Sequence, residues 1–253
     1  MGPKRVALIT GVTRRRGVGA AAALALAQNG IDVALAYYRP YDRTMPWGVE
    51  DTEPEQIVDE VRKIGVRAKG YEVDLGEPSG PHTLFQHVLE DFGHADILVN
   101  NAAYSTECTL ESMSAETLDR HYSVNLRALM LLSAEFIRAF RGERGGRIVN
   151  LTSGQGLGPM PSELAYAATK GGVEAFTLSL SAAAAPRGIT VNAVDPGATD
   201  TGWMSDDIRQ SLIRSAPMGR VGMPFDAANL IAFLVSEEAQ WITGQVIRSR
   251  GGA

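Results

Sequence analysis

The sequence is poor in cysteine, has no long apolar run and carries no excess of positive charge. Its 253 residues include one cysteine, Cys108, so no disulfide can form within the chain, which favours a reducing, cytoplasmic location. No segment approaches the ~18 uninterrupted apolar residues of a membrane-spanning helix, and the N-terminal residues lead directly into an expected strand rather than a signal segment. With a net charge of -5, we expect neither a nucleic acid nor a membrane as partner.

Metal-ligating residues are also sparse. The four histidines, His82, His87, His94 and His121, are scattered without metal-ligand spacing and form no cluster with the cysteine. The sequence therefore predicts no metal site.

What is present is a regular alternation of short β-branched runs and longer helical segments. The expected strands are residues 6–10, 32–38, 66–74, 96–100, 147–152, 189–195 and 245–249, and the helical segments include 20–30, 53–65 and the pieces near 114–141 and 163–186. Several strands are almost wholly apolar, as in parallel sheets covered on both faces. The pattern predicts an α/β protein: a single-domain Rossmann-type doubly wound parallel sheet of about seven strands flanked by helices, over residues 1–253.

A glycine-rich turn follows the first expected strand. Thr10-Gly11 ends that strand and Gly17-Val18-Gly19 opens the next helix, an arrangement that presents free amides and a positive helix end to a pyrophosphate. Taken alone, the same glycines could serve only to reverse the chain.

Together with this turn, motifs along nearly the whole chain resemble those of a known family. They are Thr10-Gly11 with Gly17-Val18-Gly19, Asp74-Leu75, Asn100-Asn101-Ala102-Ala103, Asn125, Ser153, Tyr166-Ala-Ala-Thr-Lys170, Pro196-Gly197 to Thr201 and Ile242-Thr243-Gly244-Gln245. With them the chain resembles a short-chain dehydrogenase/reductase, closest to the 3-oxoacyl-carrier-protein reductase branch.

The resemblance implies a cofactor site. Asp74 would hold the adenine, Asn101 would line the cofactor channel, and residues 196–201 would border the nicotinamide. The full expected set is Gly11, Arg14, Arg15, Arg16, Gly17, Val18, Gly19, Tyr38, Arg39, Asp74, Leu75, Asn101, Ala102, Ala103, Tyr166, Lys170, Pro196, Gly197, Thr199 and Thr201.

The chain departs from the family pattern in three places. Five residues instead of three separate Gly11 from Gly17, an insertion within the arginine run; Ala103 replaces a glycine; and Arg250 stands where the Asp-Gly-Gly tail usually has its acid. None of these changes removes a catalytic group.

The cofactor implied is NADP(H). Members of the family that prefer NAD carry an acid at the end of the second strand, where this chain has Tyr37, so no carboxylate is there to repel a ribose 2′-phosphate. Arg14 to Arg16 and Arg39 are expected to converge on that phosphate, although at least one of the three adjacent arginines should remain solvated.

The connection after the second strand is unusually long. Residues 39–54 form a connection about three times as long as the usual βα loop of roughly 2–6 residues. Because Tyr41, Met45 and Trp47 are costly to leave in water, we expect this segment to fold over the adenosine end of the cofactor.

A candidate catalytic group completes the resemblance. Tyr166 and Lys170 lie four residues apart on one helix face, and Ser153 ends a strand thirteen residues earlier. Tyrosine, with a reference pKa of about 10, would donate the proton, Lys170 would lower that pKa and hold the ribose, and Ser153 would stabilise the alkoxide. Asn125 matches the fourth residue of the family's catalytic set. A structural role, as an amide at a helix kink or cap, is an equally good interpretation.

The substrate is less defined by the sequence. Residues 154–161, Tyr104 and the loop 198–204 are expected to wall a pocket for an apolar or flat carbonyl compound. A set of arginines near the fourth expected helix could receive an acidic carrier protein or simply form a solvated helix face: Arg120, Arg127, Arg138, Arg141, Arg144 and Arg187. Three hypotheses follow: a 3-oxoacyl-carrier-protein reductase, a reductase of a free ketone or polyketide, and a nucleotide-sensing binding protein without turnover.

The family likeness also implies a homotetramer, with segments 114–141 and 163–186 paired against their symmetry mates. The small side chains of residues 181–185 permit close helix approach, and Val246-Ile247 would lie at a second interface. High helix propensity on a surface helix explains the alanines equally well.

Overall fold

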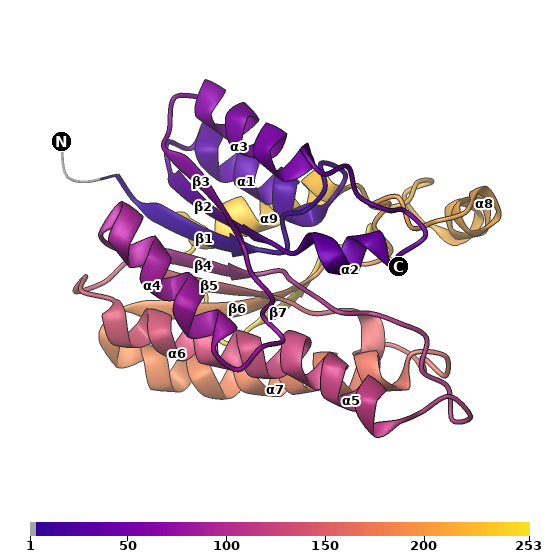
Figure 1. Ribbon diagram of the computed structural model, residues 1–253. Coiled ribbons are helices and arrows are strands. Elements are labelled where there is room, and N and C mark those ends of the chain that lie inside the picture. The colour runs from indigo at the N-terminus through magenta and orange to yellow at the C-terminus, as the bar shows by residue number, and fades with distance from the viewer. Residues whose placement is uncertain (1–3) are drawn as a thin grey trace.

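The computed structural model describes residues 4–253 and contains a seven-stranded parallel sheet. The strands are β1 (Val6–Thr10), β2 (Asp32–Tyr37), β3 (Ala68–Glu72), β4 (Ile97–Asn100), β5 (Gly146–Leu151), β6 (Ile189–Asp195) and β7 (Val246–Arg248). Their order in the sheet is β3-β2-β1-β4-β5-β6-β7, and every pair is parallel. The predicted doubly wound sheet is confirmed (Figure 1).

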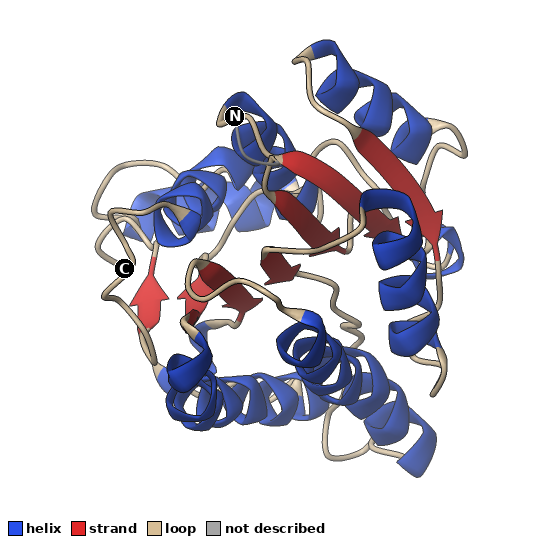
Figure 2. Ribbon diagram, turned by 90° about the vertical axis from the view of Figure 1, so that its left-hand side faces the viewer, coloured by secondary structure: helices blue, strands red, loops and turns tan. Residues whose placement is uncertain are grey.

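Helices cover both faces of the sheet. The α-helices are α1 (Val18–Gln28), α2 (Arg39–Arg43), α3 (Glu53–Lys63), α4 (Gly80–Phe92), α5 (Ala115–Tyr122), α6 (Leu129–Ala139), α7 (Leu164–Ala184), α8 (Asp206–Ser215) and α9 (Pro224–Val235). Helices α1, α3 and α9 lie on one side of the strands, and α4, α6 and α7 lie on the other (Figures 1 and 2).

The first strand shows why the sheet must be covered twice. Ala7 and Ile9 pack into the core beneath α1, α3 and α9, whereas Val6 and Leu8 pack into the core on the opposite face. All four side chains are completely buried. Because burying each large apolar side chain contributes about 1.5–3 kcal/mol, both helix layers are needed to stabilise an apolar strand of this kind.

The strand order reverses between β1 and β4, and this reversal positions the site. Connections from β1 lead to one side of the sheet through α1, and those from β4 lead to the other, so the loops diverge at the carboxyl ends. Such a switch point leaves a crevice in which α/β proteins bind ligands. Helices α2 and α8 lie at this end of the sheet (Figure 1).

Two local features differ from the sequence expectations. Residues 39–43 of the long connection form helix α2, which Pro40 favours because proline is preorganised for the first helical turn. The expected helix near 114–141 is divided by a π-helical turn, η1 (Ser123–Ala128), which changes the direction of the side chains in it.

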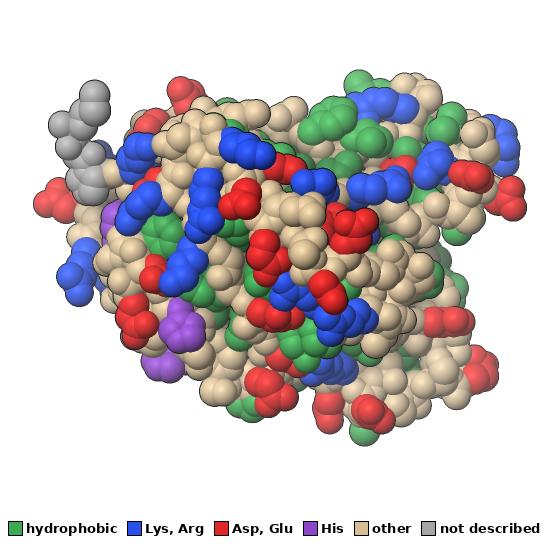
Figure 3. Space-filling view, turned by 45° about the horizontal axis from the view of Figure 1, so that its top comes forward, with side chains coloured by type: hydrophobic (Ala, Val, Ile, Leu, Met, Phe, Trp, Pro, Cys, Tyr) green, Lys and Arg blue, Asp and Glu red, His purple; other side chains and the backbone are tan. Residues whose placement is uncertain are grey.

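The charged side chains are mixed on the face displayed in Figure 3, where Lys and Arg lie among Asp and Glu. Within residues 4–253, no helix has both the length and the apolar character needed to cross a membrane.

Candidate active site

The glycine turn after β1 is held close to the loop after β4. Gly11 has a φ of 74°, and a Cβ there would lie 2.7 Å from the Cα of Ala102, so a larger residue would push the two segments apart. The hydroxyl of Thr10 accepts hydrogen bonds from the backbone N–H groups of Asn101 and Ala102, both at 3.0 Å. The side-chain Nδ2 of Asn101 in turn donates to the backbone carbonyl of Thr10 at 2.8 Å. The turn is therefore rigid before any ligand binds.

Helix α1 begins at this turn without a side-chain cap. Its N-cap residue, Gly17, has no side chain to accept from the first-turn N–H groups. Gly11, Gly17 and Val18 line a cleft together with Asn101, so the free amides of the helix end lie beside it. This is the arrangement that binds a phosphate group.

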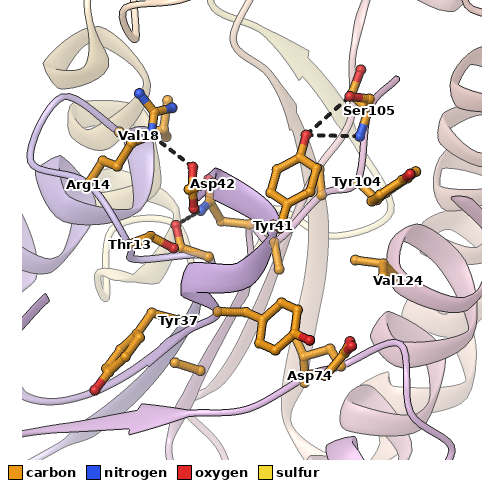
Figure 4. Close-up of a pocket in the computed structure, with 18 of the residues that line it drawn as sticks. Thr13, Arg14, Val18, Tyr37, Tyr41, Asp42, Asp74, Tyr104, Ser105 and Val124 are labelled. Carbon is orange, nitrogen blue, oxygen red and sulfur yellow. Dashed lines mark hydrogen bonds and ion pairs between the residues drawn. The ribbon is translucent and has the colours of Figure 1, made fainter. Parts of the chain in front are cut away.

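The far end of the cleft lies between the ends of β2 and β3. Tyr37, Tyr38, Asp74 and Leu75 line it, as the sequence predicts (Figure 4). The Asp74 carboxylate accepts from Nη2 of Arg120 at 2.9 Å, so this arginine, placed by the sequence in a surface patch, lines the cleft instead. Burial and the nearby Asp74 raise the pKa of the Tyr38 hydroxyl.

The arginines of the turn do not converge on one point. Arg14 lies against the inserted segment: its Nε is 3.0 Å from the carboxylate of Asp42, and its guanidinium stacks 4.8 Å from the centre of the Trp47 ring. Its Nη1 donates to the Thr201 carbonyl at 2.8 Å. Arg14 thus joins the turn to the inserted segment and to the loop after β6, and Figure 4 shows its contact with Asp42.

Arg15 and Arg16 point in other directions. Arg15 pairs with Glu60 of α3 at 2.5 Å, and Arg16 pairs with Asp200 of the loop after β6 at 3.2 Å. Neither side chain belongs to the lining of the cleft. The expected convergence is therefore wrong for these two residues, because each guanidinium has a carboxylate of its own nearby.

Arg39 is the arginine that remains at the end of β2. It stacks 4.8 Å from the centre of the Tyr37 ring and pairs with both Glu55 and Glu72. Its pKa is raised, chiefly by the hydrogen bond to Glu55. A phosphate at this position would have to compete with two carboxylates for the guanidinium.

The inserted segment packs its aromatic side chains inward. The Tyr41 hydroxyl donates to the Ser105 carbonyl at 3.1 Å and accepts from the Ser105 N–H at 3.2 Å, and its ring lies 5.3 Å from that of Tyr104. The Trp47 indole donates to Asp42 at 2.9 Å. Both rings line the cleft, and Trp47 with Met45 also borders a second cavity, so the inserted segment contributes to both.

Of the Ser, Tyr and Lys expected to act together, the first two line these cavities. Tyr166 lines both cavities, and Ser153 lines the second one. Burial raises the pKa of Tyr166 to about 12, and the nearby Ser153 hydroxyl opposes this effect. The structure therefore does not show the lowered tyrosine pKa that the sequence predicts.

Lys170 lies behind the tyrosine and is 3% exposed. Its Nζ donates to the Leu151 carbonyl at 2.7 Å and lies 5.5 Å from the centre of the Tyr166 ring. Burial lowers the pKa of Lys170 to about 8, because the ammonium loses its hydration.

Asn125 lies in the π-helical turn, where its side chain points into the protein and is 1% exposed. Its Oδ1 accepts from the Tyr104 N–H at 2.7 Å, and its Nδ2 donates to the Tyr104 carbonyl at 2.9 Å and to Thr169 at 3.1 Å. The side chain therefore braces the loop after β4 against α7. The π-helical turn has no periodicity signal that sequence analysis could have detected.

The second cavity has most of the walls that the sequence predicts. Gly154, Leu157–Met160, Ala198 and Trp203 line it, together with Pro196, Gly197, Thr199 and Thr201. The other expected residues do not line it: Tyr104 borders the first cleft, Met204 is buried, and Gln155, Gly156, Pro161, Asp200 and Gly202 are absent from the lining. Arg250, a residue that the sequence marks only as a departure from a pattern, reaches this cavity from the end of the chain.

Metal-ligating residues do not gather in this region. Within residues 4–253, no group of three or more His, Cys, Asp or Glu side chains is arranged to hold a metal ion.

The fold and the strand-end site are those of a short-chain dehydrogenase/reductase, an oxidoreductase family. A family model described as enoyl-(acyl carrier protein) reductase matches residues 11–253, and the chain belongs to this family. It is 45% identical over 251 residues to the uncharacterized oxidoreductase YjdA of Bacillus subtilis, covering 98% of this chain and 96% of the relative. It is 34% identical to the 3-oxoacyl-[acyl-carrier-protein] reductase FabG of Staphylococcus epidermidis, covering 97% of each chain.

Solved structures agree with this assignment. A short-chain dehydrogenase from Burkholderia cenocepacia in complex with NADP has a TM-score of 0.88 and 34% identity, covering 98% of this chain and 97% of the other. The predicted family, with its likeness to the 3-oxoacyl-carrier-protein reductases, is confirmed.

Proposed function

We propose that residues 1–253 act as one domain that uses NADPH to reduce a ketone to a secondary alcohol. The observation that carries this proposal is the position of Tyr166, which lines both the glycine-lined cleft and the second cavity, with Ser153 in the lining of the second. A serine and a tyrosine that line the same cavity can hold and protonate a carbonyl oxygen.

The cleft suits a dinucleotide phosphate. The uncapped N–H groups of α1 and the rigid glycine turn fit a pyrophosphate, and Asp74 with Leu75 would border the adenine. Tyr37 leaves no carboxylate on β2 to repel a 2′-phosphate, and Arg39 is beside it. NADP binding by a relative that is 34% identical supports the same choice of cofactor.

Bound in this cleft, NADPH would supply the hydride. Tyr166 would give its hydroxyl proton to the carbonyl oxygen, and its raised pKa keeps that proton in place at neutral pH. Ser153 would donate a hydrogen bond to the same oxygen as its negative charge grows. The Lys170 ammonium would favour loss of the tyrosine proton and hold ribose hydroxyls. Asn125 would hold the loop after β4 against α7, through its hydrogen bonds to Tyr104 and Thr169.

The substrate class that we propose is a 3-oxoacyl thioester or related carbonyl compound, because the relative from Staphylococcus epidermidis is a 3-oxoacyl-[acyl-carrier-protein] reductase. Support for an acyl carrier protein as partner is weaker. Of the arginines proposed to receive it, Arg120 is paired with Asp74, and Arg127 and Arg187 donate to the carbonyls of Gly76 and Phe140. A free ketone is therefore the alternative substrate, and a cytoplasmic location remains part of the proposal.

Replacing the proposed proton donor tests this function. Tyr166→Phe should lower NADPH oxidation, followed at 340 nm with acetoacetyl-carrier protein, an acetoacetyl thioester and free diketones, by at least ~100-fold. Cofactor binding, measured by NADPH fluorescence, should survive. Tyr122→Phe, at a tyrosine that is 47% exposed on α5, is the matched control and should retain activity. Wild-type turnover by Tyr166→Phe would show that the mechanism is wrong.

A further inference from the structure

Arg250, which follows β7, spans the carboxyl ends of three neighbouring strands. Its Nη1 donates to Oδ2 of Asp195, the last residue of β6, at 2.9 Å. Its guanidinium continues to the end of β5, where Nη2 would lie 3.1 Å from a Cβ built on Gly154, the residue after Ser153. A Cβ at Gly154 would overlap Nη1, so the position of the guanidinium depends on this glycine.

Asp195 fixes the arginine and neutralises its charge. The carboxylate is 1% exposed, and its second oxygen accepts from the Gly197 N–H at 2.9 Å. The stem of Arg250 packs on Gly197, with Cγ 3.0 Å from where a Cβ would be. The ion pair therefore holds the guanidinium rigidly against the turn that borders the proposed nicotinamide position.

The guanidinium keeps donors that no protein atom uses. Its side chain is 20% exposed, and Arg250 lines the second cavity together with Ser153 and Tyr166. The Asp195 bond uses one Nη1 hydrogen, and Nη2 donates to no atom of residues 4–253. An arginine presents several N–H donors in a rigid plane, so the unused ones can bind a further oxygen.

The charges around Arg250 determine which kind of substrate oxygen its free N–H groups can bind. Arg250 is the single Arg, Lys or His among the described residues that line the cavity, whereas Glu107 and Glu163 also line it. Asp195 is already paired to the guanidinium, so a carboxylate on the substrate would be the fourth negative group in this region, after Glu107, Glu163 and Asp195. An uncharged carbonyl oxygen can accept the free N–H groups without that repulsion.

We propose that Arg250 determines substrate specificity by donating to a second, uncharged carbonyl oxygen of the substrate, near the ketone held by Ser153 and Tyr166. The inference rests on the proposed ketone reduction and adds a selection rule to it. Uncharged 3-oxo esters or thioesters bind well, ketones without a second oxygen bind less well, and free 3-oxo acids are disfavoured.

Three small ketones separate these classes. Ethyl acetoacetate has the second carbonyl, 2-heptanone replaces its ester group by two methylenes at nearly the same length, and acetoacetate carries a carboxylate. The wild type should have the highest kcat/KM for the ester. Arg250→Met should lower that value by roughly 10–100-fold, mainly through KM, because the hydrogen bond is present in both the ground state and the transition state. Its kcat/KM for 2-heptanone should change less than about threefold.

Removing the arginine alone leaves Asp195 buried and unpaired, which could prevent folding. The double variant Asp195→Asn/Arg250→Met removes both charges and should show the same selective loss, with its fold checked by circular dichroism and NADPH binding. Arg248→Met is the matched control: Arg248 lies two residues earlier, is exposed, and is absent from the cavity lining, so its loss should leave all three substrates unaffected.

The outcomes distinguish the two proposals. Equal losses with the ester and 2-heptanone, or a wild-type preference for acetoacetate, would overturn the role of Arg250 while leaving ketone reduction intact. Absence of NADPH oxidation with every ketone and with the acetoacetyl thioester would overturn the proposed function itself.

Discussion

The guanidinium of Arg14 and the carboxylate of Asp42 form an ion pair at 3.0 Å that ties the glycine turn to the inserted segment. Asp42 is 6% exposed and also accepts from Trp47, so the pair lies inside the protein rather than in solvent. The arginine run in the turn therefore has a structural task, which is to connect the turn with segments that border the cleft.

Because Arg14 is paired with Asp42, we expect Arg39 to be the arginine that distinguishes NADPH from NADH. Arg39→Met should raise the KM for NADPH about tenfold and leave that for NADH nearly unchanged, because Arg39 lies at the end of β2 and a charge-assisted contact contributes about 1.5–3 kcal/mol before its competition with Glu55 and Glu72. Arg43→Met, an exposed arginine of the same helix, is the control. Equal affinity of the wild type for the two cofactors would contradict the prediction of NADPH preference.

The inserted segment should respond to the cofactor. Backbone amides of residues 39–54 are expected to exchange more slowly when NADPH is added, because Tyr41 and Trp47 line the cleft. Asp42→Asn should weaken the tie to Arg14 and speed exchange in the free protein, in keeping with a local loss of about 1–3 kcal/mol. Mass-spectrometric hydrogen exchange measures both effects, and unchanged exchange on cofactor addition would mark the segment as a passive surface feature.

The pH dependence of reduction follows from Lys170. Since its pKa is about 8, the ammonium is present below that pH and is lost as the pH rises through it. Tyr166, with a pKa of about 12, keeps its proton throughout this range. We expect kcat/KM for the ketone to be level below pH 8 and to fall above it, and Lys170→Met to abolish this transition. A wild-type profile that stays level to pH 10 would be inconsistent with this role of the lysine.

The predicted homotetramer remains to be tested, and exposed apolar side chains indicate where its interfaces would form. Leu131 on α6 and Leu178 on α7 are 40% and 64% exposed, and Trp241, before β7, is 95% exposed. Light scattering at micromolar concentration should give four times the 27.1 kDa chain mass, and Leu178→Glu should reduce it. A mass of one chain would refute the assembly, and a dimer would leave the helix-paired interface alone.

The sequence by itself determined the fold and the main chemical groups of the candidate site. Continuous apolar runs such as residues 6–10 can be satisfied only by a sheet covered on both faces, and the glycine spacing places a helix end beside the first strand. Ser153, Tyr166 and Lys170 were recognisable because their relation depends on local spacing: a strand end, a connection and one turn of helix.

Tertiary structure decided the features that depend on partners distant in the chain. Arg14, Arg15 and Arg16 are adjacent in sequence, yet each turns toward a carboxylate from a different segment, and no local rule assigns those partners. The pKa of Tyr166 rises and the pKa of Lys170 falls because both groups are buried, and their burial depends on packing. Arg250 reaches the cavity through Asp195, 55 residues away, because β6 and β7 are neighbours in the sheet. Electrostatic pairing acts over a few ångströms of space, so only the folded chain defines it.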